Sequence, residues 1–275
     1  IEKVKENVLE SAKVVGATVT RTYLKQEEYT GFDNVVVDEA SMVLLPSLYN
    51  VLGFASKKCV ISGDFRQIAP IVQSNQEEIH DEISKDIFAF SGVEELSQKG
   101  RNTKNLIMLK KQYRMQGNIC NLINSFMYRG ELVTAKLEEP QTIVPDFFEN
   151  IVIIDTSKIF PFSQKKNTSY YNLMHALAVR NLINIFNDQS EKNLSIGVCT
   201  PYTAQAKMHI SLNSDHANVV SGTVHRFQGD EKDIMIIDTV DSLGDSQVGN
   251  WAMSDLPNED GCKLWNVAIS RAKDH

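Results

Sequence analysis

This 275-residue chain lacks a long apolar run. None approaches the roughly 18 to 20 residues that cross a bilayer, and the opening residues, IEKVKENVLE, carry charges where a signal peptide would be apolar. We therefore expect a soluble intracellular protein, cytoplasmic or nuclear, without a membrane partner. Cysteine is also scarce. The four cysteines (Cys59, Cys120, Cys199 and Cys262) lie far apart, without the short pairs typical of zinc or redox sites, which indicates reduced packing residues.

An excess of positive charge is absent too. The 28 lysines and arginines against 35 acidic residues give a formal net charge of -7. This balance excludes a protein that coats nucleic acid by bulk electrostatics. Any contact with a nucleic acid must therefore be local, in a groove.

Short apolar runs alternate with amphipathic stretches of helical length, which predicts an α/β fold with mainly parallel sheets flanked by helices. The predicted strands lie in residues 13–19, 34–40, 57–64, 105–112, 150–155, 194–200 and 232–240. The predicted helices lie in residues 46–55, 117–128, 172–186 and 202–213, with Pro46 and Pro201 expected in first turns. A polar stretch at 97–105 predicts domains 1–100 and 101–275, and residues 241–261 read as a surface loop.

Polar residues follow two of the predicted strands in the first domain. Asp38 and Glu39 come directly after a buried run, at the strand end where open α/β sheets bind ligands. Asp38 could ligate Mg²⁺ and Glu39 could deprotonate an attacking water, although an acidic pair there is also typical of a solvated strand end. The next strand ends in Gly63 and Asp64, followed by Gln67. A glycine that frees the backbone, an acid and an amide at one strand end can sense a phosphate.

Two arginines stand out in the second domain. Arg114 ends the first predicted strand beyond the boundary, and Arg271 lies on a predicted short helix near the C-terminus. Both could stabilise charge that develops on a transferred γ-phosphoryl group. The alternative for each is a surface ion pair worth under about 1 kcal/mol.

The segment TVHRFQGDEKD combines hydroxyl, imidazole and acidic groups just before a predicted strand. Thr223 and His225 could hold a sugar-phosphate backbone. Gly229 and Glu231 follow, and Glu231 could accept a hydrogen bond from a ribose hydroxyl. Alternatively, His225 is a polar loop residue. His225 has no second histidine or cysteine nearby, so the sequence does not predict a metal site there. His175 and His209, on predicted helices, are expected to be structural or exposed.

Taken in order, VVVDEAS, SGDFRQIAP, QYRM, TPYTAQ, TVHRFQGDEKD and NVAISRAK resemble motifs II, III, IV, Va, V and VI of superfamily 1 helicases. KVVGATVTRTYL near the start is similar to motif Ic. The likeness is to the branch with the nonsense-mediated-decay RNA helicase and the DNA-processing helicase-nucleases. It implies two RecA-like domains, the first incomplete, that bind ATP, Mg²⁺ and single-stranded DNA or RNA. It also implies possible fused nuclease or accessory domains in the parent protein.

The resemblance assigns roles position by position. In the ATP site, it implies that Asp38 holds magnesium, Glu39 is the catalytic base and Gln67 senses the γ-phosphate. It also implies that Arg114 and Arg271 are arginine fingers and that Glu231 contacts the ribose. Gly63, Asp64 and Gly229 are expected beside the nucleotide. Positions that face the single strand are Thr18, Thr20, Thr200, Pro201, Tyr202, Thr223 and His225.

One element of the family is missing. No G-x-x-x-x-G-K-[ST] loop, which would hold the β- and γ-phosphates, occurs in the sequence. We therefore expect a fragment that is inactive as an isolated chain and belongs to an ATP-dependent helicase or translocase. Two alternatives remain. The chain could be part of a nucleic-acid-dependent ATP switch or scaffold that clamps a strand without unwinding, or it could be an inert folding unit.

Overall fold

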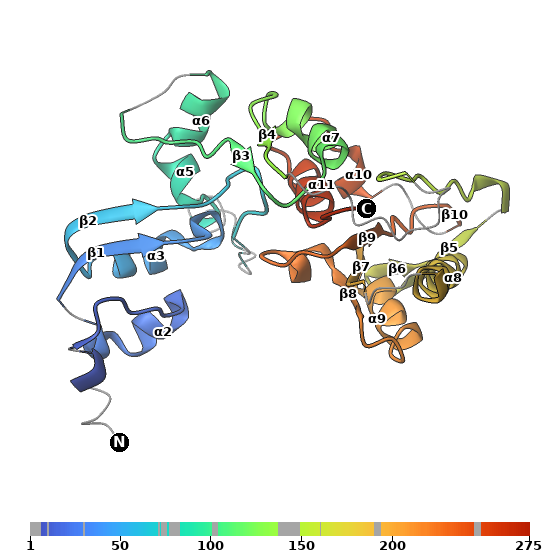
Figure 1. The fold of residues 1–275 in the computed structure, drawn as a ribbon, viewed down its shortest axis with the longest axis horizontal. Helices are drawn as coiled ribbons and strands as arrows, with labels where there is room; N and C mark the ends of the chain where they lie inside the picture. The colour runs from blue at the N-terminus through green and yellow to red at the C-terminus, as the bar shows by residue number, and fades with distance from the viewer. Residues whose placement is uncertain are drawn as a thin grey trace. The chain divides into compact units, whose positions relative to one another are not determined.

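A computed structural model describes residues 7–9, 11–29, 31–70, 72, 76, 83–100, 104–136, 149–159, 161–189, 194–244 and 249–275. The chain divides into two compact units, residues 1–106 and residues 107–275, which we call unit 1 and unit 2 (Figure 1). The sequence places its boundary after residue 100. Both units combine parallel strands with helices, so the predicted α/β class is confirmed.

Unit 1 is built on a β-α-β crossover. Strand β1 (Phe32–Val37) pairs in parallel with β2 (Ala55–Ile61), and helix α3 (Leu45–Leu52) connects them. Pro46 lies in the first turn of α3, as predicted. The core packs residues of β1 and α3 against Phe65 and Phe88. The remaining elements are α2 (Val19–Leu24), η1 (Gln26–Glu28), η2 (Ala40–Met42), α5 (Ile87–Phe90) and α6 (Val93–Gln98).

Unit 2 is built on a parallel sheet of order β8-β7-β9. The strands are β7 (Ile196–Thr200), β8 (Val219–Thr223) and β9 (Ile234–Ile237), and β7 is buried along its whole length. Helix α8 (Leu173–Gln189) packs on this sheet in an apolar cluster, and α9 (Thr203–Leu212) connects β7 to β8. Smaller elements are β3 (Lys111–Gln112), β4 (Val133–Thr134), η3 (Ser157–Ile159), η4 (Val224–Phe227) and α10 (Asn250–Met253).

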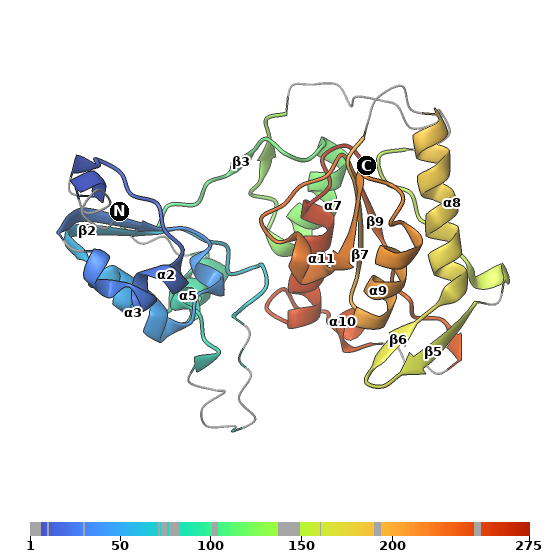
Figure 2. The ribbon, with the colours of Figure 1, turned by 90° about the horizontal axis from the view of Figure 1, so that it is seen from below.

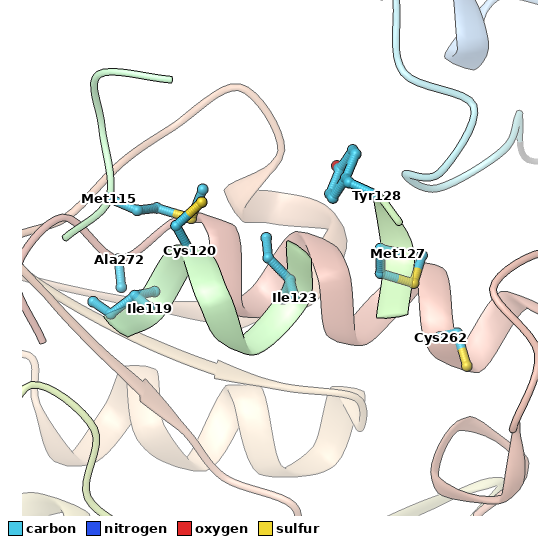
Figure 3. Close-up of a cluster of buried hydrophobic side chains, with 8 residues drawn as sticks. All are labelled: Met115, Ile119, Cys120, Ile123, Met127, Tyr128, Cys262 and Ala272. Atoms are coloured by element: carbon cyan, nitrogen blue, oxygen red, sulfur yellow. The ribbon is translucent and has the colours of Figure 1, made fainter. Parts of the chain in front are cut away.

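A second core in unit 2 joins α7 (Gly117–Met127) to α11 (Asp260–Ser270), although well over a hundred residues separate them. Figure 3 shows the side chains that fill the space between them: Met115, Ile119, Cys120, Ile123, Met127, Tyr128, Cys262 and Ala272. Beyond α11, the chain pairs with the start of β9. Lys232 bridges Ala272 in parallel, and the Met235 amide donates to the His275 carbonyl over 2.9 Å. This pairing places Arg271 at the amino end of β9.

A hairpin completes unit 2. Strand β5 (Phe162–Lys166) pairs in antiparallel with β6 (Ser169–Tyr171), and β10 (Leu243–Gly244) pairs in parallel with β5. The hairpin and the C-terminus lie at opposite ends of the β8-β7-β9 sheet (Figure 2). Residues 241–261, predicted as a surface loop, contain two short elements, strand β10 and helix α10.

Three predicted strands are wrong or much shorter than expected. Residues 13–19 hold no strand, because the Thr18 hydroxyl accepts from the Arg21 amide and starts α2 instead. Only Lys111–Gln112 of residues 105–112 is a strand, and residues 150–155 form none. Ile107 is 82% exposed and Ile153 is 90% exposed. An apolar run becomes a strand only where a neighbour offers hydrogen bonds. Residues 13–19 and 150–155 pair with no described strand, and residues 105–112 do so only at their end, where Lys111 and Gln112 pair with β4.

The other predicted features fared better. All four predicted helices occur, although Pro201 precedes the N-cap of α9 rather than lying in its first turn. All four cysteines are free thiols, and three are buried as predicted, while Cys59 is exposed. No described helix is long and apolar enough to cross a membrane. Among the residues that the structure covers, no group of His, Cys, Asp and Glu could hold a metal as a preformed cluster.

Candidate functional site

The acidic pair in unit 1 lies at the carboxyl end of β1 with both side chains exposed. Asp38 Oδ1 accepts from the Ser62 hydroxyl over 2.9 Å and from the Glu39 amide over 3.0 Å. Glu39 itself is left-handed, with φ of 52°, a conformation that costs a residue other than glycine about 1 to 3 kcal/mol. The described hydrogen bonds to Asp38 fall on Oδ1, so Oδ2 can turn outward. A single outward carboxylate fits Mg²⁺, which keeps most of its waters.

Gly63 is required for a different reason than its sequence context suggests. Its φ is not positive, so the fold does not depend on the wider backbone conformational freedom of glycine at this position. A Cβ at this position would lie 3.0 Å from the backbone nitrogens of Ala40 and Ser41. The glycine therefore lets the turn that carries Asp38 and Glu39 pack directly on the end of β2.

Asp64 orients the amide predicted to sense a phosphate. Its Oδ1 accepts from the Arg66 amide and its Oδ2 accepts from Gln67 Nε2, both over 3.0 Å. Sequence reasoning missed Arg66, which is buried with its guanidinium 4.7 Å from the Phe65 ring centroid. Arg66 Nη2 also donates to Ser97 Oγ over 3.3 Å. The loop from Asp64 to Gln67 is thus held by hydrogen bonds within unit 1.

Unit 2 brings three distant motifs together at the amino end of β9. Arg114 follows β3 by two residues rather than ending a long strand, and its Nε donates to Glu231 Oε2 over 3.0 Å. Arg114 Nη1 donates to the Ser270 carbonyl over 3.3 Å. Arg271 is the C-cap of α11 and is only 2% exposed, with Nη2 donating to Ser270 Oγ over 2.9 Å. Arg271 Nε donates to the Val267 carbonyl over 3.2 Å, so its guanidinium folds back onto α11. Arg114 and Glu231 therefore contact each other directly, and Arg271 adjoins them through Ser270.

The loop before β9 has features of a ligand site. Gly229 has φ of 78°, which only glycine adopts without strain. Both polar atoms of the Gln228 side chain are buried and have no described hydrogen-bond partner. Buried amides are normally satisfied, so this one is available to an incoming polar group. The hydrogen bond from Lys232 holds the pKa of Asp230 below its usual range, which keeps that carboxylate charged beside Gly229.

The residues of unit 2 that were predicted to face a nucleic-acid strand gather at the carboxyl end of the same sheet. Thr200 pairs with Thr223 across β7 and β8, but Thr200 is fully buried, and its hydroxyl accepts from the Tyr202 amide over 3.4 Å. Pro201 is partly exposed. His225 lies on η4 with its side chain reaching solvent, while partial desolvation of its imidazole lowers its pKa. The side chain of Thr200 therefore positions the Tyr202 loop rather than presenting a surface.

Tyr202 is held from several sides. Its hydroxyl donates to Asp241 Oδ1 over 2.8 Å and accepts from Trp251 Nε1 over 3.3 Å. Its ring meets that of Tyr170 edge-on, with centroids 5.4 Å apart. Burial, and then the hydrogen bond to Asp241, raise the pKa of Tyr202 to about 12. In unit 1, Thr18 caps α2 and Thr20 is exposed in its first turn.

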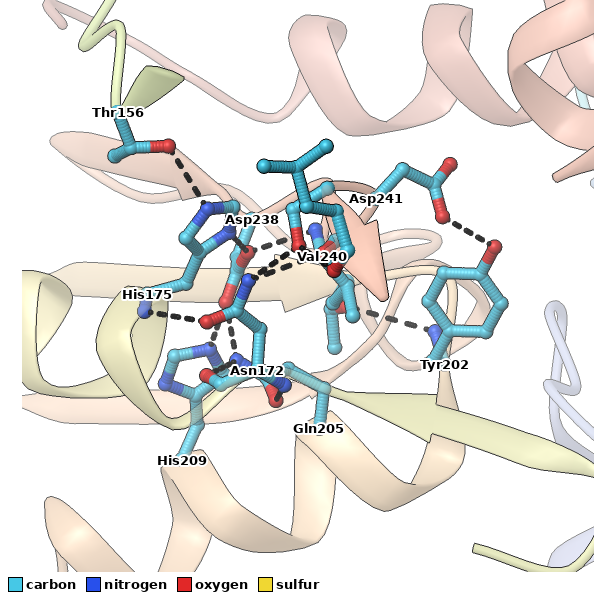
Figure 4. A network of polar contacts seen from close by, with 12 residues as sticks. Thr156, Asn172, His175, Tyr202, Gln205, His209, Asp238, Val240 and Asp241 are labelled. Atoms are coloured by element: carbon cyan, nitrogen blue, oxygen red, sulfur yellow. Dashed lines mark hydrogen bonds and ion pairs between the residues drawn. The ribbon is translucent and has the colours of Figure 1, made fainter. Parts of the chain in front are cut away.

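Sequence reasoning missed a buried network centred on Asp238, just beyond β9 (Figure 4). His175 Nδ1 lies 3.0 Å from Asp238 Oδ1, and His209 Nε2 lies 2.7 Å from Oδ2. Gln205 Nε2 donates to Oδ2 over 2.6 Å. Burial alone would raise the pKa of Asp238, but hydrogen bonds from His175 and His209 hold it well below its usual range. Both histidines are structural, as predicted.

The same network holds a strained turn. Val240 is buried with φ of 65°, an outlier for a β-branched residue. Its amide donates to Asp238 Oδ1 over 2.9 Å, and its carbonyl accepts from Asn172 Nδ2 over 3.4 Å. The next residue is Asp241, the partner of Tyr202. The network therefore fixes where Asp241 meets Tyr202, and no local sequence signal announces it because its members come from separate elements.

Comparisons with known proteins agree over nearly the whole chain. Two families, both described as "AAA domain", match residues 1–75 and residues 89–275, and the second match alone spans more than half of the chain. The chain is 28% identical over 266 residues to the DNA replication ATP-dependent helicase/nuclease dna2 of Schizosaccharomyces pombe, covering 88% of this chain and 18% of that protein.

Two further relatives come from distant organisms. The uncharacterized ATP-dependent helicase MJ0104 of Methanocaldococcus jannaschii is 27% identical over 288 residues, which is 99% of this chain and 39% of that protein. The 5'-3' DNA helicase ZGRF1 of Mus musculus is 26% identical over 276 residues, which is 98% of this chain and 14% of that protein. The chain thus spans well under half of the length of these relatives.

Proposed function

Because the chain belongs to the AAA domain family and is a superfamily 1 helicase chain, we propose that it couples ATP hydrolysis to movement along a single strand of DNA or RNA. The observation that carries the proposal is the contact of Arg114 with Glu231 at the amino end of β9, with Arg271 adjoining Arg114 through Ser270. Two guanidinium groups beside a carboxylate suit a nucleotide, with the arginines toward phosphate and Glu231 toward the ribose.

The residues of unit 1 would complete the chemistry. Asp38 would hold Mg²⁺ through water or directly, and this ion would neutralise charge on the phosphates. Glu39, with its exposed carboxylate at the same strand end, orients and deprotonates the attacking water. Gln67, held by Asp64, reports the state of the γ-phosphate. These roles follow from the strand-end positions together with the family.

The strand would bind at the other end of the sheet. Thr223, Pro201, Tyr202 and His225 lie around the carboxyl ends of β7 and β8, with Thr200 beneath them. In unit 1, Thr18 and Thr20 are proposed as strand contacts from the family motif alone. Hydroxyl and imidazole groups contact phosphate and sugar without reading sequence, so both DNA and RNA fit. One relative is a DNA replication ATP-dependent helicase/nuclease and another is a 5'-3' DNA helicase, which supports DNA as the substrate and a fused nuclease in the parent protein.

The test is turnover in the full-length protein. An arginine finger contributes roughly a thousandfold or more to phosphoryl transfer, so Arg114→Ala should nearly abolish ATPase while largely sparing strand binding. Arg271 is buried, so Arg271→Lys, which keeps a positive charge, is the matched variant for that position. Near-normal turnover in both variants would exclude the arginine roles. The 275-residue chain alone, without a phosphate-cradling loop in its sequence, should show no measurable ATPase.

A duplex-unwinding assay separates the motor from a clamp. If the full-length protein hydrolyses ATP on a single strand and separates a tailed duplex, the motor is supported. If it hydrolyses ATP and holds the strand without separating or moving along it, the switch or scaffold alternative is correct.

A further inference from the structure

We propose that the β5–β6 hairpin is a second contact for single-stranded nucleic acid, continuous with the Tyr202 loop and absent from every motif of the sequence. The proposal rests on the proposed function, because it extends the strand path at the carboxyl end of the sheet. The hairpin comprises Phe162–Lys166 and Ser169–Tyr171. Its chemistry and its attachment to the Tyr202 loop carry the argument.

The hairpin is attached to the candidate strand site at three points. Ser169 Oγ accepts from the Ala204 amide over 3.0 Å, so the hairpin caps the first turn of α9. The Tyr170 ring packs edge-on against Tyr202. On the other side, β5 pairs with β10, which follows directly on the turn that holds Asp241. These contacts attach the hairpin to the segments that carry Tyr202 and its hydrogen-bond partner Asp241. A nucleic-acid strand bound on Tyr202 would therefore lie next to the hairpin.

The hairpin presents adjacent basic and aromatic groups. Lys165 lies directly across from Tyr170 in the register, and its Nζ is 5.8 Å from the ring centroid. Lys165 and Lys166 are exposed, and Tyr170 is partly exposed. Asn167, with φ of 56°, closes the turn between Lys166 and Ser169 in a conformation that asparagine tolerates. Successive side chains of a strand point to opposite faces, so Lys165 shares the face of Tyr170 and Lys166 extends from the tip on the other face. Lys165 can hold a phosphate while the ring takes a base, and Lys166 adds positive charge at the tip.

Single-stranded nucleic acid is the occupant that fits this surface. Positive charge complements a phosphate backbone. Exposed lysine pairs also occur at 57–58 and 110–111, and what distinguishes Lys165 and Lys166 is the neighbouring Tyr170 ring and the attachment to the Tyr202 loop. A tyrosine ring stacks on an unpaired base, whereas the faces of bases in a duplex are already stacked on each other. The surface therefore favours a single strand over a duplex.

The experiment is fluorescence anisotropy with labelled 20-nucleotide oligo-dT, oligo-U and a duplex of equal length, using the full 275-residue chain. We expect Lys165→Glu/Lys166→Glu to weaken single-strand affinity roughly tenfold or more. We also expect the slope of log affinity against log salt to become shallower by about 1.4, or about 0.7 for each lost phosphate contact. Lys110→Glu/Lys111→Glu, two exposed lysines on the segment leading to Arg114, makes the same charge change and should alter affinity less than twofold.

A second pair of variants tests the ring. Tyr170→Ala should weaken single-strand binding roughly fivefold to tenfold, because stacking on one base contributes about 1 to 3 kcal/mol, while Tyr170→Phe should retain it. Circular dichroism melting of each variant checks that it is folded. If Tyr170→Ala unfolds, the lysine variant decides alone.

Three outcomes overturn the inference. If the wild-type chain binds a single strand and the hairpin variants bind equally well, the hairpin is not a contact, although the proposed function survives. If the hairpin variants lose duplex binding only, the occupant is wrong. If the wild-type chain binds no strand, the proposed strand site fails, and the inference fails with it.

Discussion

The two ends of the β8-β7-β9 sheet differ in chemistry. At the amino end, charges meet in pairs: Arg114 with Glu231, Lys232 with Asp230, and Lys273 with Asp233. At the carboxyl end, the contacts run through hydroxyl, imidazole, amide and aromatic groups around the buried carboxylate of Asp238 and the Asp241 carboxylate that accepts from Tyr202. The first end suits a compact polyanion such as a nucleotide. The second suits a flexible strand, whose bases need aromatic surfaces and whose sugars need hydroxyl contacts.

Strand β9 links the two ends. Asp233, just before β9, binds the Ser195 hydroxyl over 2.6 Å and Lys273 over 2.6 Å, while Asp238, just after it, binds His175 and His209. Each carboxylate fixes the position of the loops at its own end. The comparison therefore predicts that substitutions at one end change stability or ligand affinity there and leave the other end intact.

The largest expected effect is on stability at the carboxyl end. Asp238→Asn removes the charge that His175, His209 and Gln205 surround, and breaking such a buried pair costs about 3 to 5 kcal/mol in the free energy of unfolding. Urea denaturation followed by circular dichroism measures this change. Asp215→Asn is the control, because Asp215 pairs with Arg180 on the surface and its loss should leave the midpoint nearly unchanged. Equal effects of both substitutions would contradict the structural role of Asp238.

The acid sensitivity of unit 2 follows from the same carboxylate. The folded-state pKa of Asp238 is lower than its usual value of about 3.9, so its contribution to stability is complete above that value. The contribution is lost as pH falls through the lower folded pKa. The difference in unfolding free energy between the wild type and Asp238→Asn should therefore shrink from about pH 4 downward. A difference that stays constant to pH 2 would show that the pKa is not depressed.

A smaller effect is expected in unit 1 at the acidic turn. Gly63→Ala places a Cβ against the backbone of Ala40 and Ser41, which cannot yield without moving Asp38 and Glu39. Overpacking of this kind costs about 1 to 3 kcal/mol. Gly16→Ala is the control, because nothing lies within 4 Å of its Cβ. Urea denaturation of both variants gives the answer, and equal midpoints would show that the turn is loosely packed.

The smallest effect on stability is expected at Glu231. Its ion pair with Arg114 joins side chains that are 50% and 33% exposed, so Glu231→Gln should cost under about 1 kcal/mol. The KM for ATP in the full-length protein should nevertheless rise severalfold, because an amide is a weaker acceptor for a ribose hydroxyl than a carboxylate. Steady-state ATPase assays measure the KM, and an unchanged value would remove the ribose role.

Local patterns in the sequence predicted much of the secondary structure. Strands β1, β2, β7 and β9 and the four predicted helices were found from apolar periodicity. The roles of the site residues stay predictions, although Arg114 and Glu231 do contact each other. Three strands failed because periodicity reports an apolar run but not whether a neighbouring strand exists to pair with it. Residues 150–155 illustrate this, since they are apolar and yet exposed.

Features that depend on several distant segments could not be predicted from local patterns. The Asp238 network draws its members from α8, α9 and the end of β9, and no spacing within one segment reveals it. Gly63 was predicted to matter, but the reason is close packing against η2, which only the three-dimensional arrangement shows. The hairpin at residues 162–171 was not predicted because its strands are short and mostly polar.

The most direct test of the central claim, that the two ends serve different ligands, is single-strand affinity of the 275-residue chain by anisotropy in the absence of nucleotide. Tyr202→Ala should weaken binding roughly tenfold, because it removes an aromatic surface worth about 1 to 3 kcal/mol per stacked base. Arg114→Ala, at the opposite end, should bind within twofold of the wild type. Equal losses in both variants, or a loss confined to Arg114→Ala, would contradict the division of the sheet into two sites.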